Sequence, residues 1–388
     1  MSIAQSHLNS AVAIIEQYKG EEPFAAFLRK YFSQHKKYGS KDRKQVAHLC
    51  YCYFRLGKAL MNMPNSQRIV AALFLCSNIP DPLLDALKPS WGEKVLLPVE
   101  EKLAIIEGKE IINNIFPWNE LLSAGIDHLQ FCKSLLIQPD LFLRIRPGKA
   151  EQVQLKLQQA DIIFSRPNAI CIALDNRTKI DELIILDKEA VVQDYNSQKV
   201  GDFLSLLPVQ NKRRVWDCCA ASGGKSIMAA DLLGDILLTV SDIRESILIN
   251  LKKRFTAASI KNYKSFVADL SVAGLPESDE KFDLVIADVP CSGSGTWSRT
   301  PEQLFYFKNE MIEKYALLQK QIMSNVLQHV KPGGYILYIT CSVFKVENEG
   351  MINWLLERDQ FNLVKMELLV GYSFRADTMF AALLQKPL

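Results

Sequence analysis

The second half of the chain alternates short apolar runs with longer amphipathic stretches, and this pattern constrains the fold more than any other feature. Strands are expected at 213–217, 236–241, 263–267, 282–288 and 334–340. Helices are expected at 223–233, 244–258, 309–330 and 346–357. Strands that alternate with helices form a parallel sheet covered on both faces. A final pair of runs, near 361–365 and 378–385, is too closely spaced for a helix and predicts an antiparallel hairpin at the sheet edge.

Paired glycines follow the first expected strand and open a helix. Gly223 and Gly224 let the backbone approach a ligand closely, and a helix N-terminus favours negative groups. The stretch Gly-Gly-Lys-Ser lacks the earlier glycine of a phosphate-binding P-loop, and it is not a dinucleotide-binding GxGxxG motif. The turn therefore favours a methionine-type cofactor over a phosphate-bearing one.

Acidic residues at the ends of the next strands support this interpretation. Asp242 is placed to hold a pair of ribose hydroxyls, and Asp269 to reach an adenine edge. Either acid alone is more often a helix cap. Together with the Gly-Gly turn they predict an S-adenosylmethionine (SAM) site. Its predicted contacts are Cys219, Ala220, Ala221, Ser222, Gly223, Gly224, Lys225, Asp242, Arg244, Asp269 and Asp288.

Two of the expected buried strands end on a cysteine, Cys291 after Asp288-Val-Pro and Cys341 after Thr340. If these strands are parallel neighbours, both thiols and Asp288 lie at one edge of the sheet. This arrangement suits chemistry at carbon 5 of a pyrimidine. A thiolate must add to carbon 6 before carbon 5 can accept a methyl group, and a base must then remove the carbon-5 proton.

The two cysteines can supply nucleophile and base between them, and the residues alone do not rank them. Asp288 can bind the nitrogen edge of the ring, and Lys225 is the nearest group that could favour a thiolate. We assign the remaining cysteines to packing. Their spacing contains no CxxC pair and no zinc pattern, so no metal is expected. His329 falls in an expected helix, which weakens a Cys–His hydrolase interpretation.

The first 135 residues read as helices, with apolar residues at helical spacing near 5–19, 46–56, 67–77 and 99–113. Basic residues gather here, at Arg29, Lys30, Lys36, Lys37, Lys41, Arg43, Lys44, Arg55 and Lys58. Such a run is often only a solvated face, but the interleaved aromatic residues favour RNA, with Arg43 and Lys44 as candidate contacts.

Residues 136–203 predict a small α+β unit of order β-α-β-β-α-β. Strands are expected at 141–145, 162–164, 169–174 and 190–193, with helices at 148–159 and 178–183. This order is ferredoxin-like and resembles the sheet of RNA-recognition modules. Arg144 and Arg146 would then face RNA, or merely keep an outer face soluble.

Bulk composition narrows the class further. The 388 residues carry a net charge of +3, so attraction to RNA must come from local clusters. No apolar run has membrane-spanning length, and the N-terminus lacks the pattern of a signal peptide. We therefore expect a cytoplasmic protein with reduced thiols, away from membranes, and a monomer.

The motifs resemble, in order, those of the RsmB/Nop/Sun RNA cytosine-5 methyltransferases. The matching stretches are Asp217–Lys225, Asp242–Arg244, Ala268–Asp269, Asp288–Gly295 and Thr340–Ser342. Val192–Asp194 with Ser197–Gln198, Arg299–Pro301 and Phe380–Ala382 are also similar to family segments, and Gly39–Arg43 is similar to the NusB-like domain of the bacterial rRNA branch. The resemblance implies a NusB-like helical domain (1–135), an RNA-recognition-like unit (136–203) and a Rossmann-like catalytic domain (204–388).

The resemblance also implies roles for individual residues. Cys341 would be the nucleophile, Cys291 would assist product release, and Asp288 would bind the cytosine edge, while Arg299 would contact RNA. The chain departs from the family at three places. Ser222 replaces the usual proline, Arg146 an asparagine, and Asp377-Thr-Met-Phe the usual Asp-Gly-Phe-Phe.

We therefore predict a SAM-dependent RNA cytosine-5 methyltransferase acting on small-subunit rRNA. Nothing in the residues separates this from a tRNA enzyme. An RNA-binding assembly factor with lost activity ranks lower, because Cys291, Cys341 and Asp288 are intact. A small-molecule methyltransferase also ranks lower, because a small substrate needs no basic N-terminal platform.

Overall fold

The computed structural model describes residues 2–106, 111–272, 280–358 and 361–388. Two compact units result. The first is Met1–Leu122, Ile126–Gln138 and Thr296–Lys308, and the second is Ser123–Gly125, Pro139–Gly295 and Asn309–Leu388. The predicted α+β unit and the predicted catalytic domain thus form one compact body. The segment Thr296–Lys308, which was predicted to be part of the catalytic domain, belongs instead to the helical unit.

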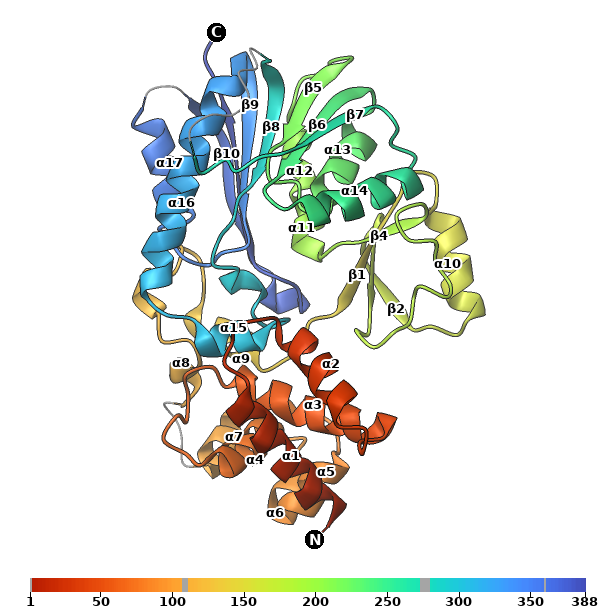
Figure 1. Cartoon of the computed structure of the whole chain (residues 1–388), viewed down its shortest axis with the longest axis vertical. Helices are drawn as coiled ribbons and strands as arrows, with labels where there is room; N and C mark the ends of the chain where they lie inside the picture. The colour runs from red at the N-terminus through yellow and green to blue at the C-terminus, as the bar shows by residue number, and fades with distance from the viewer. Residues whose placement is uncertain (1, 107–110, 273–279, 359–360) are drawn as a thin grey trace. The chain divides into compact units, whose positions relative to one another are not determined.

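The first unit is helical, as predicted (Figure 1). Its described elements are α1 (Ile3–Gln17), α2 (Phe24–Gln34), α3 (Ser40–Arg55), α4 (Asn65–Cys76), α5 (Pro82–Leu87), α6 (Pro89–Gly92), α7 (Val99–Ile105), α8 (Ile111–Ile115), η1 (Asn119–Leu121), α9 (His128–Leu135) and α15 (Pro301–Tyr306). The helix expected over 99–113 corresponds to α7 and the start of α8, and its residues 107–110 lie outside the described part of the chain.

The basic run divides into exposed and buried members. Most of its residues, from Arg29 to Lys44, are exposed. Arg55 is buried and donates to the carbonyls of Leu135 and Ile137 at 3.0 and 3.1 Å. Arg55 therefore stabilises the end of α9, because those carbonyls have no partner within the helix.

The segment 296–308 is built into the helical unit. Trp297 is fully buried, with its ring centroid 5.8 Å from that of Phe116. Glu302 accepts from the backbone N–H of Phe24 at 3.3 Å, and Tyr306 donates to the carbonyl of Tyr18 at 2.6 Å. These contacts join residues far apart in sequence, so the segment is an integral part of this unit.

The second unit contains the predicted ferredoxin-like sheet. Strands β1 (Leu141–Ile145), β2 (Phe164–Asn168), β3 (Cys171–Leu174) and β4 (Ala190–Val192) form an antiparallel sheet in the order β2-β3-β1-β4, with α10 (Ala150–Gln159) beside it. The helix expected at 178–183 is wrong. Its residues form turns, with Ile180 and Ile184 buried in the core of this sheet.

Within the described residues the main sheet has seven strands, and five consecutive ones are parallel to one another. They are β5 (Arg213–Asp217), β6 (Ile236–Asp242), β7 (Tyr263–Val267), β8 (Phe282–Asp288), β9 (Val330–Thr340), β10 (Asn362–Leu369) and β11 (Met379–Gln385). Their order is β10-β11-β9-β8-β5-β6-β7, with β10 and β11 antiparallel at one edge. Both the alternating pattern and the terminal hairpin are confirmed.

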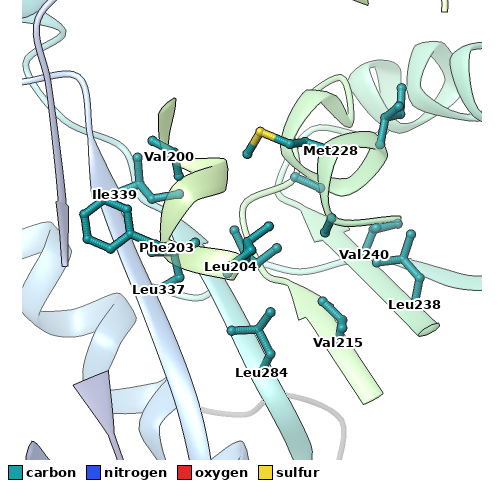
Figure 2. Close-up of a cluster of buried hydrophobic side chains, with 14 of the residues drawn as sticks. Val200, Phe203, Leu204, Val215, Met228, Leu238, Val240, Leu284, Leu337 and Ile339 are labelled. Atoms are coloured by element: carbon teal, nitrogen blue, oxygen red, sulfur yellow. The ribbon is translucent and has the colours of Figure 1, made fainter. Parts of the chain in front are cut away.

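Helices cover both faces of this sheet (Figure 1). One face carries α11 (Tyr195–Lys199), α12 (Gly201–Leu204), α13 (Gly224–Leu233) and α14 (Glu245–Ala257); the other carries α16 (Glu310–Val326) and α17 (Glu349–Leu356). Three single turns, η2 (Ser294–Thr296), η3 (Leu327–His329) and η4 (Tyr372–Phe374), complete the elements named here. Figure 2 shows how Phe203 and Met228 pack with the sheet residues Val215, Leu284 and Leu337. Both layers of helices hold the sheet rigid beneath its carboxyl edge. Across the described ranges, no helix is long and apolar enough to cross a membrane.

Candidate active site

The two predicted cysteines meet at the carboxyl ends of β8 and β9. These strands pair in parallel, with Asp288 opposite Ile339, so the residues that follow them leave the sheet side by side. The sulfur atoms of Cys291 and Cys341 lie 3.3 Å apart, although 50 positions separate them in sequence. Both thiols are half-buried. The predicted convergence of the two thiols is confirmed.

A close backbone approach brings together the loop that carries Cys291 and the loop that carries Cys341, called the two cysteine loops below. The N–H of Gly295 donates to the carbonyl of Cys341 at 2.8 Å, and the carbonyl of Gly295 accepts from the N–H of Thr378 at 3.0 Å. A Cβ atom on Gly295 would lie 1.9 Å from the carbonyl oxygen of Thr378. Only glycine fits at this position, because any side chain would push the loops apart.

The environment of the thiols makes Cys291 a weak acid. Its hydrogen bond with Cys341 and its burial raise the pKa of the Cys291 thiol well above the usual value, and the nearby carboxylate of Glu347 adds to the effect. A thiol with a raised pKa is a strong proton acceptor once it is deprotonated. In the resting site the Cys291 thiol therefore stays protonated, in contact with the sulfur of Cys341.

A lysine–aspartate pair lies beside the sheet edge. The ammonium of Lys225 lies 3.0 Å from a carboxylate oxygen of Asp288 and donates to the hydroxyl of Ser197 at 2.9 Å. Lys225 is mostly buried, so this contact fixes the orientation of Asp288. Sequence reasoning placed Lys225 near the chemistry but gave Ser197 no role, since nothing in its position pointed to the lysine.

The glycine turn after β5 has the conformation expected of a cofactor loop. Gly223 has a φ of +85° and caps α13, and a Cβ there would lie 2.6 Å from the ring of Phe255. A Cβ on Gly224 would meet nothing within 4 Å, so the helix N-terminus opens onto free space. Arg254 holds the turn from behind by donating to the carbonyl and hydroxyl of Ser222 at 3.0 and 2.8 Å.

Asp242 ties the glycine turn to the next strand. It is buried, and its carboxylate accepts from the N–H of Ala221 at 3.0 Å and from the N–H of Arg244 at 3.0 Å. The Arg244 side chain closes an ion pair with the same carboxylate at 3.1 Å. Asp242 therefore orders both predicted cofactor loops, and its contact with a ribose stays a prediction. Of the other predicted cofactor contacts, Cys219 and Ala220 lie in the same turn.

Asp269 differs from Asp242 in its surroundings. Its carboxylate is exposed and accepts from the N–H and hydroxyl of Ser271 at 2.9 and 2.6 Å. This is the capping arrangement that a strand-end acid commonly adopts. A contact between Asp269 and an adenine stays a prediction.

Asp217 is a titrating group that the sequence did not reveal. It is fully buried at the end of β5, and its carboxylate accepts from the hydroxyl of Ser226 at 2.6 Å. Burial raises the pKa of Asp217 to about 7, with smaller contributions from Asp288 and Asp242.

The predicted RNA contacts fall into two groups. Arg144 and Arg146 both pair with the buried carboxylate of Asp231, at 2.6 and 2.8 Å, so the sequence interpretation that they face RNA is corrected to a structural role. Their guanidinium groups join the ferredoxin-like sheet to α13. By contrast, Arg43 and Lys44 are exposed in the helical unit, and Arg299 is half-buried in the segment 296–308 of that unit. Within the described ranges no three His, Cys, Asp or Glu side chains are grouped so as to hold a metal ion.

The parallel sheet, its helical layers and the loops at its carboxyl edge are those of a Rossmann-like methyltransferase domain. Residues 204–380 match the family described as 16S rRNA methyltransferase RsmB/F.

Curated relatives with similar sequences carry the names of ribosomal RNA methyltransferases. Ribosomal RNA small subunit methyltransferase B of Xanthomonas campestris is 29% identical over 55% of this chain and 49% of its own length. The protein of the same name from Shewanella oneidensis is 33% identical over 45% of this chain and 40% of its own length. The matches thus span half or less of these relatives.

Solved structures show the same fold. The crystal structure of PH0851 has a TM-score of 0.71 at 20% identity and covers 100% of both chains. NSun6 from Pyrococcus horikoshii, solved with SFG, has a TM-score of 0.59 at 16% identity, covering 71% of this chain and 97% of that one.

Proposed function

We propose that this protein transfers a methyl group from SAM to carbon 5 of a cytosine in RNA, with small-subunit rRNA as the substrate class. One observation carries the proposal most directly: two thiols lie 3.3 Å apart beside the Lys225–Asp288 pair at the carboxyl edge of the sheet. The names of the curated relatives support rRNA as the substrate, and such a substrate would place the protein in the cytoplasm.

The glycine turn fits SAM as the cofactor. The open N-terminus of α13 at Gly224 accommodates a carboxylate, and the Asp242 loop provides acceptors for ribose hydroxyls. When bound there, SAM supplies an electrophilic methyl group. The family's use of this cofactor and a solved relative with SFG agree with the fit.

Residues of the chain then carry out the remaining catalytic steps. The thiol of Cys341 loses its proton to water, and the resulting thiolate adds to carbon 6 of the cytosine, which makes carbon 5 nucleophilic. Asp288, oriented by Lys225, binds the nitrogen edge of the ring. Cys291 accepts the carbon-5 proton after methylation, and the bond between Cys341 and carbon 6 then breaks. Because burial and the contact with Cys341 raise the pKa of Cys291, its thiol must first lose its own proton to water before it can accept the carbon-5 proton.

Two variants test the roles of the thiols. Cys341→Ala abolishes methylation and leaves RNA free of covalent attachment, because no nucleophile remains. Cys291→Ala still forms the adduct but releases it slowly, so protein and RNA migrate together on a denaturing gel. Methylation by Cys341→Ala at the wild-type rate would refute the assignment.

The substrate is tested separately. Bisulfite sequencing of RNA from cells with and without this gene shows which cytosine resists bisulfite deamination only when the gene is present. A protected site in 16S rRNA that disappears with the gene is the expected result. A site that disappears from tRNA alone would replace rRNA by tRNA as the substrate class.

A further inference from the structure

A buried carboxylate that the mechanism does not use lies between the two cysteine loops. Glu347 is fully buried. One carboxylate oxygen accepts from the N–H of Ser292 at 2.8 Å, and the other accepts from the hydroxyl of Ser342 at 2.6 Å. Ser292 directly follows Cys291, and Ser342 directly follows Cys341. Glu347 thus binds the backbone of the residue after Cys291 and the side chain of the residue after Cys341.

Neighbouring groups fix Glu347 in turn. The amide of Gln319 donates to the Glu347 carboxylate at 3.0 Å and to the carbonyl of Pro290, the residue before Cys291, also at 3.0 Å. The hydroxyl of Tyr338 donates to the backbone carbonyl of Glu347 at 2.7 Å. Gln319 and Tyr338 come from α16 and β9, so rigid elements support the carboxylate from both sides.

The chemistry of the contacts explains why an acid occupies this position. Ser292, Gln319 and Ser342 each direct a donor at it, and a carboxylate accepts through both oxygens. Burying a charge among neutral donors costs stability, and burial indeed raises the pKa of Glu347. A group kept at such a cost, in contact with both cysteine loops, points to a role at the thiols.

We infer that Glu347 is a positioning residue that sets the separation of the Cys291 and Cys341 sulfur atoms. The inference rests on the proposed function, because it lets the nucleophile and the proton acceptor reach one cytosine ring. Glu347 touches neither substrate nor cofactor in this role. It acts through Ser292 and Ser342.

The separation of the thiols can be measured without any methylation. Phenylarsine oxide binds two neighbouring thiols and releases one water, so both sulfur atoms bond to arsenic with no change of oxidation state. The dithiol formed by Cys291 and Cys341 should capture it tightly. Capture lost in Cys341→Ser, located by mass spectrometry of the modified peptides, defines the signal from this pair and separates it from the adjacent Cys218 and Cys219.

Three substitutions of Glu347 distinguish span from charge. Glu347→Ala loses both contacts and weakens capture by about tenfold or more, because the second thiol is no longer held near the first. Glu347→Asp keeps the charge but is one methylene shorter, so it reaches only one loop and also weakens capture. Glu347→Gln keeps the length. Its oxygen can accept from Ser292 while its amide donates to the Ser342 hydroxyl, so capture is retained.

Glu349 provides the matched control. It lies two residues further on, and its carboxylate accepts from the hydroxyl of Ser123 at 2.8 Å and from the N–H of Ala124 at 3.2 Å rather than from Ser292 or Ser342. Glu349→Ala should therefore capture the arsenical as the wild-type protein does. Capture lost equally in both alanine variants would overturn the inference, because it would show a general loss of stability.

Activity gives the second measurement. Glu347→Ala lowers kcat by about 100-fold with little change in the KM for RNA, since the thiols are displaced by about 1 Å while RNA binding is untouched. Glu347→Gln restores most of the rate. Normal capture and normal kcat in Glu347→Ala would overturn the inference. So would a result in which Glu347→Asp still captures the arsenical and Glu347→Gln does not. A wild-type protein without methyltransferase activity would refute the proposed function alone, because the capture measurement would still decide on Glu347.

Discussion

Replacing Gly295 by alanine should separate the two cysteine loops without altering any reactive group. The added Cβ would lie 1.9 Å from the carbonyl oxygen of Thr378 and 3.0 Å from that of Cys341, whereas contacts below 3.0 Å essentially never occur. Both neighbours are backbone atoms and cannot rotate away. The loop must therefore move by about 1 Å, a displacement that can cost about 100-fold in rate.

The expected effect is a loss of about 100-fold in the methylation rate, equivalent to about 2.7 kcal/mol of transition-state stabilisation. Overpacking of a buried site should also lower the free energy of unfolding by about 1–3 kcal/mol. Single-turnover transfer of a labelled methyl group to RNA measures the first quantity, and urea unfolding measures the second.

Gly350→Ala is the matched control. A Cβ at Gly350, in α17, would lie 3.2 Å from the carbonyl of Lys345, which requires only a small adjustment. Its methylation rate should stay close to that of the wild-type protein. A folded Gly295→Ala protein with the wild-type rate would show that the cysteine loops tolerate the displacement, and the reasoning from close approach would fail.

Three further outcomes follow from the structure. Asp231→Asn should lower the free energy of unfolding by about 3–5 kcal/mol, because it leaves the buried Arg144 and the half-buried Arg146 without their shared carboxylate; the exposed Asp175→Asn should cost at most about 1 kcal/mol, and equal losses in urea unfolding would contradict this. Asp217 has a folded pKa of about 7 against 3.8, so the native state binds the extra proton and the free energy of unfolding falls as pH rises from about 4 to about 7. Unfolding of Asp217→Asn across this range should lack that fall, and an unchanged slope would refute the raised pKa. Replacing the exposed Lys36 and Lys37 by glutamate should weaken RNA binding and flatten its dependence on salt concentration, measured by filter binding. The same salt slope as the wild-type protein would show that these two lysines do not contact RNA.

The sequence predicted those parts of the site that follow from topology. Parallel neighbours place their carboxyl ends at one edge, so Cys291, Cys341 and Asp288 could be brought together before any coordinates were known. The same holds for the strands of the main sheet, whose apolar runs are long and clearly bounded. The sequence pointed to Lys225 as a group that could favour a thiolate, and its contact with Asp288 was not predicted.

The features that were missed depend on where individual side chains reach. Arg144 and Arg146 alternate with apolar residues as outward-facing residues would, yet Asp231, more than 80 positions away, draws them inward. Glu347 is separated by 55 positions from Ser292, and no periodic signal connects them. The expected helix at 178–183 is too short for local preference alone to specify a helix, and its residues form turns instead.

The path of the chain limits how this protein can be divided. The segment 296–308 follows the loop that carries Cys291 and is part of the helical unit, and the chain after it belongs again to the unit that contains the sheet. No single cut can therefore yield two complete halves. A fragment starting at residue 139 would carry Trp297 and Leu304, both fully buried in the whole chain, without Phe116 and Trp118, two of the aromatic residues against which Trp297 packs. Such a fragment would expose apolar side chains that the whole chain buries.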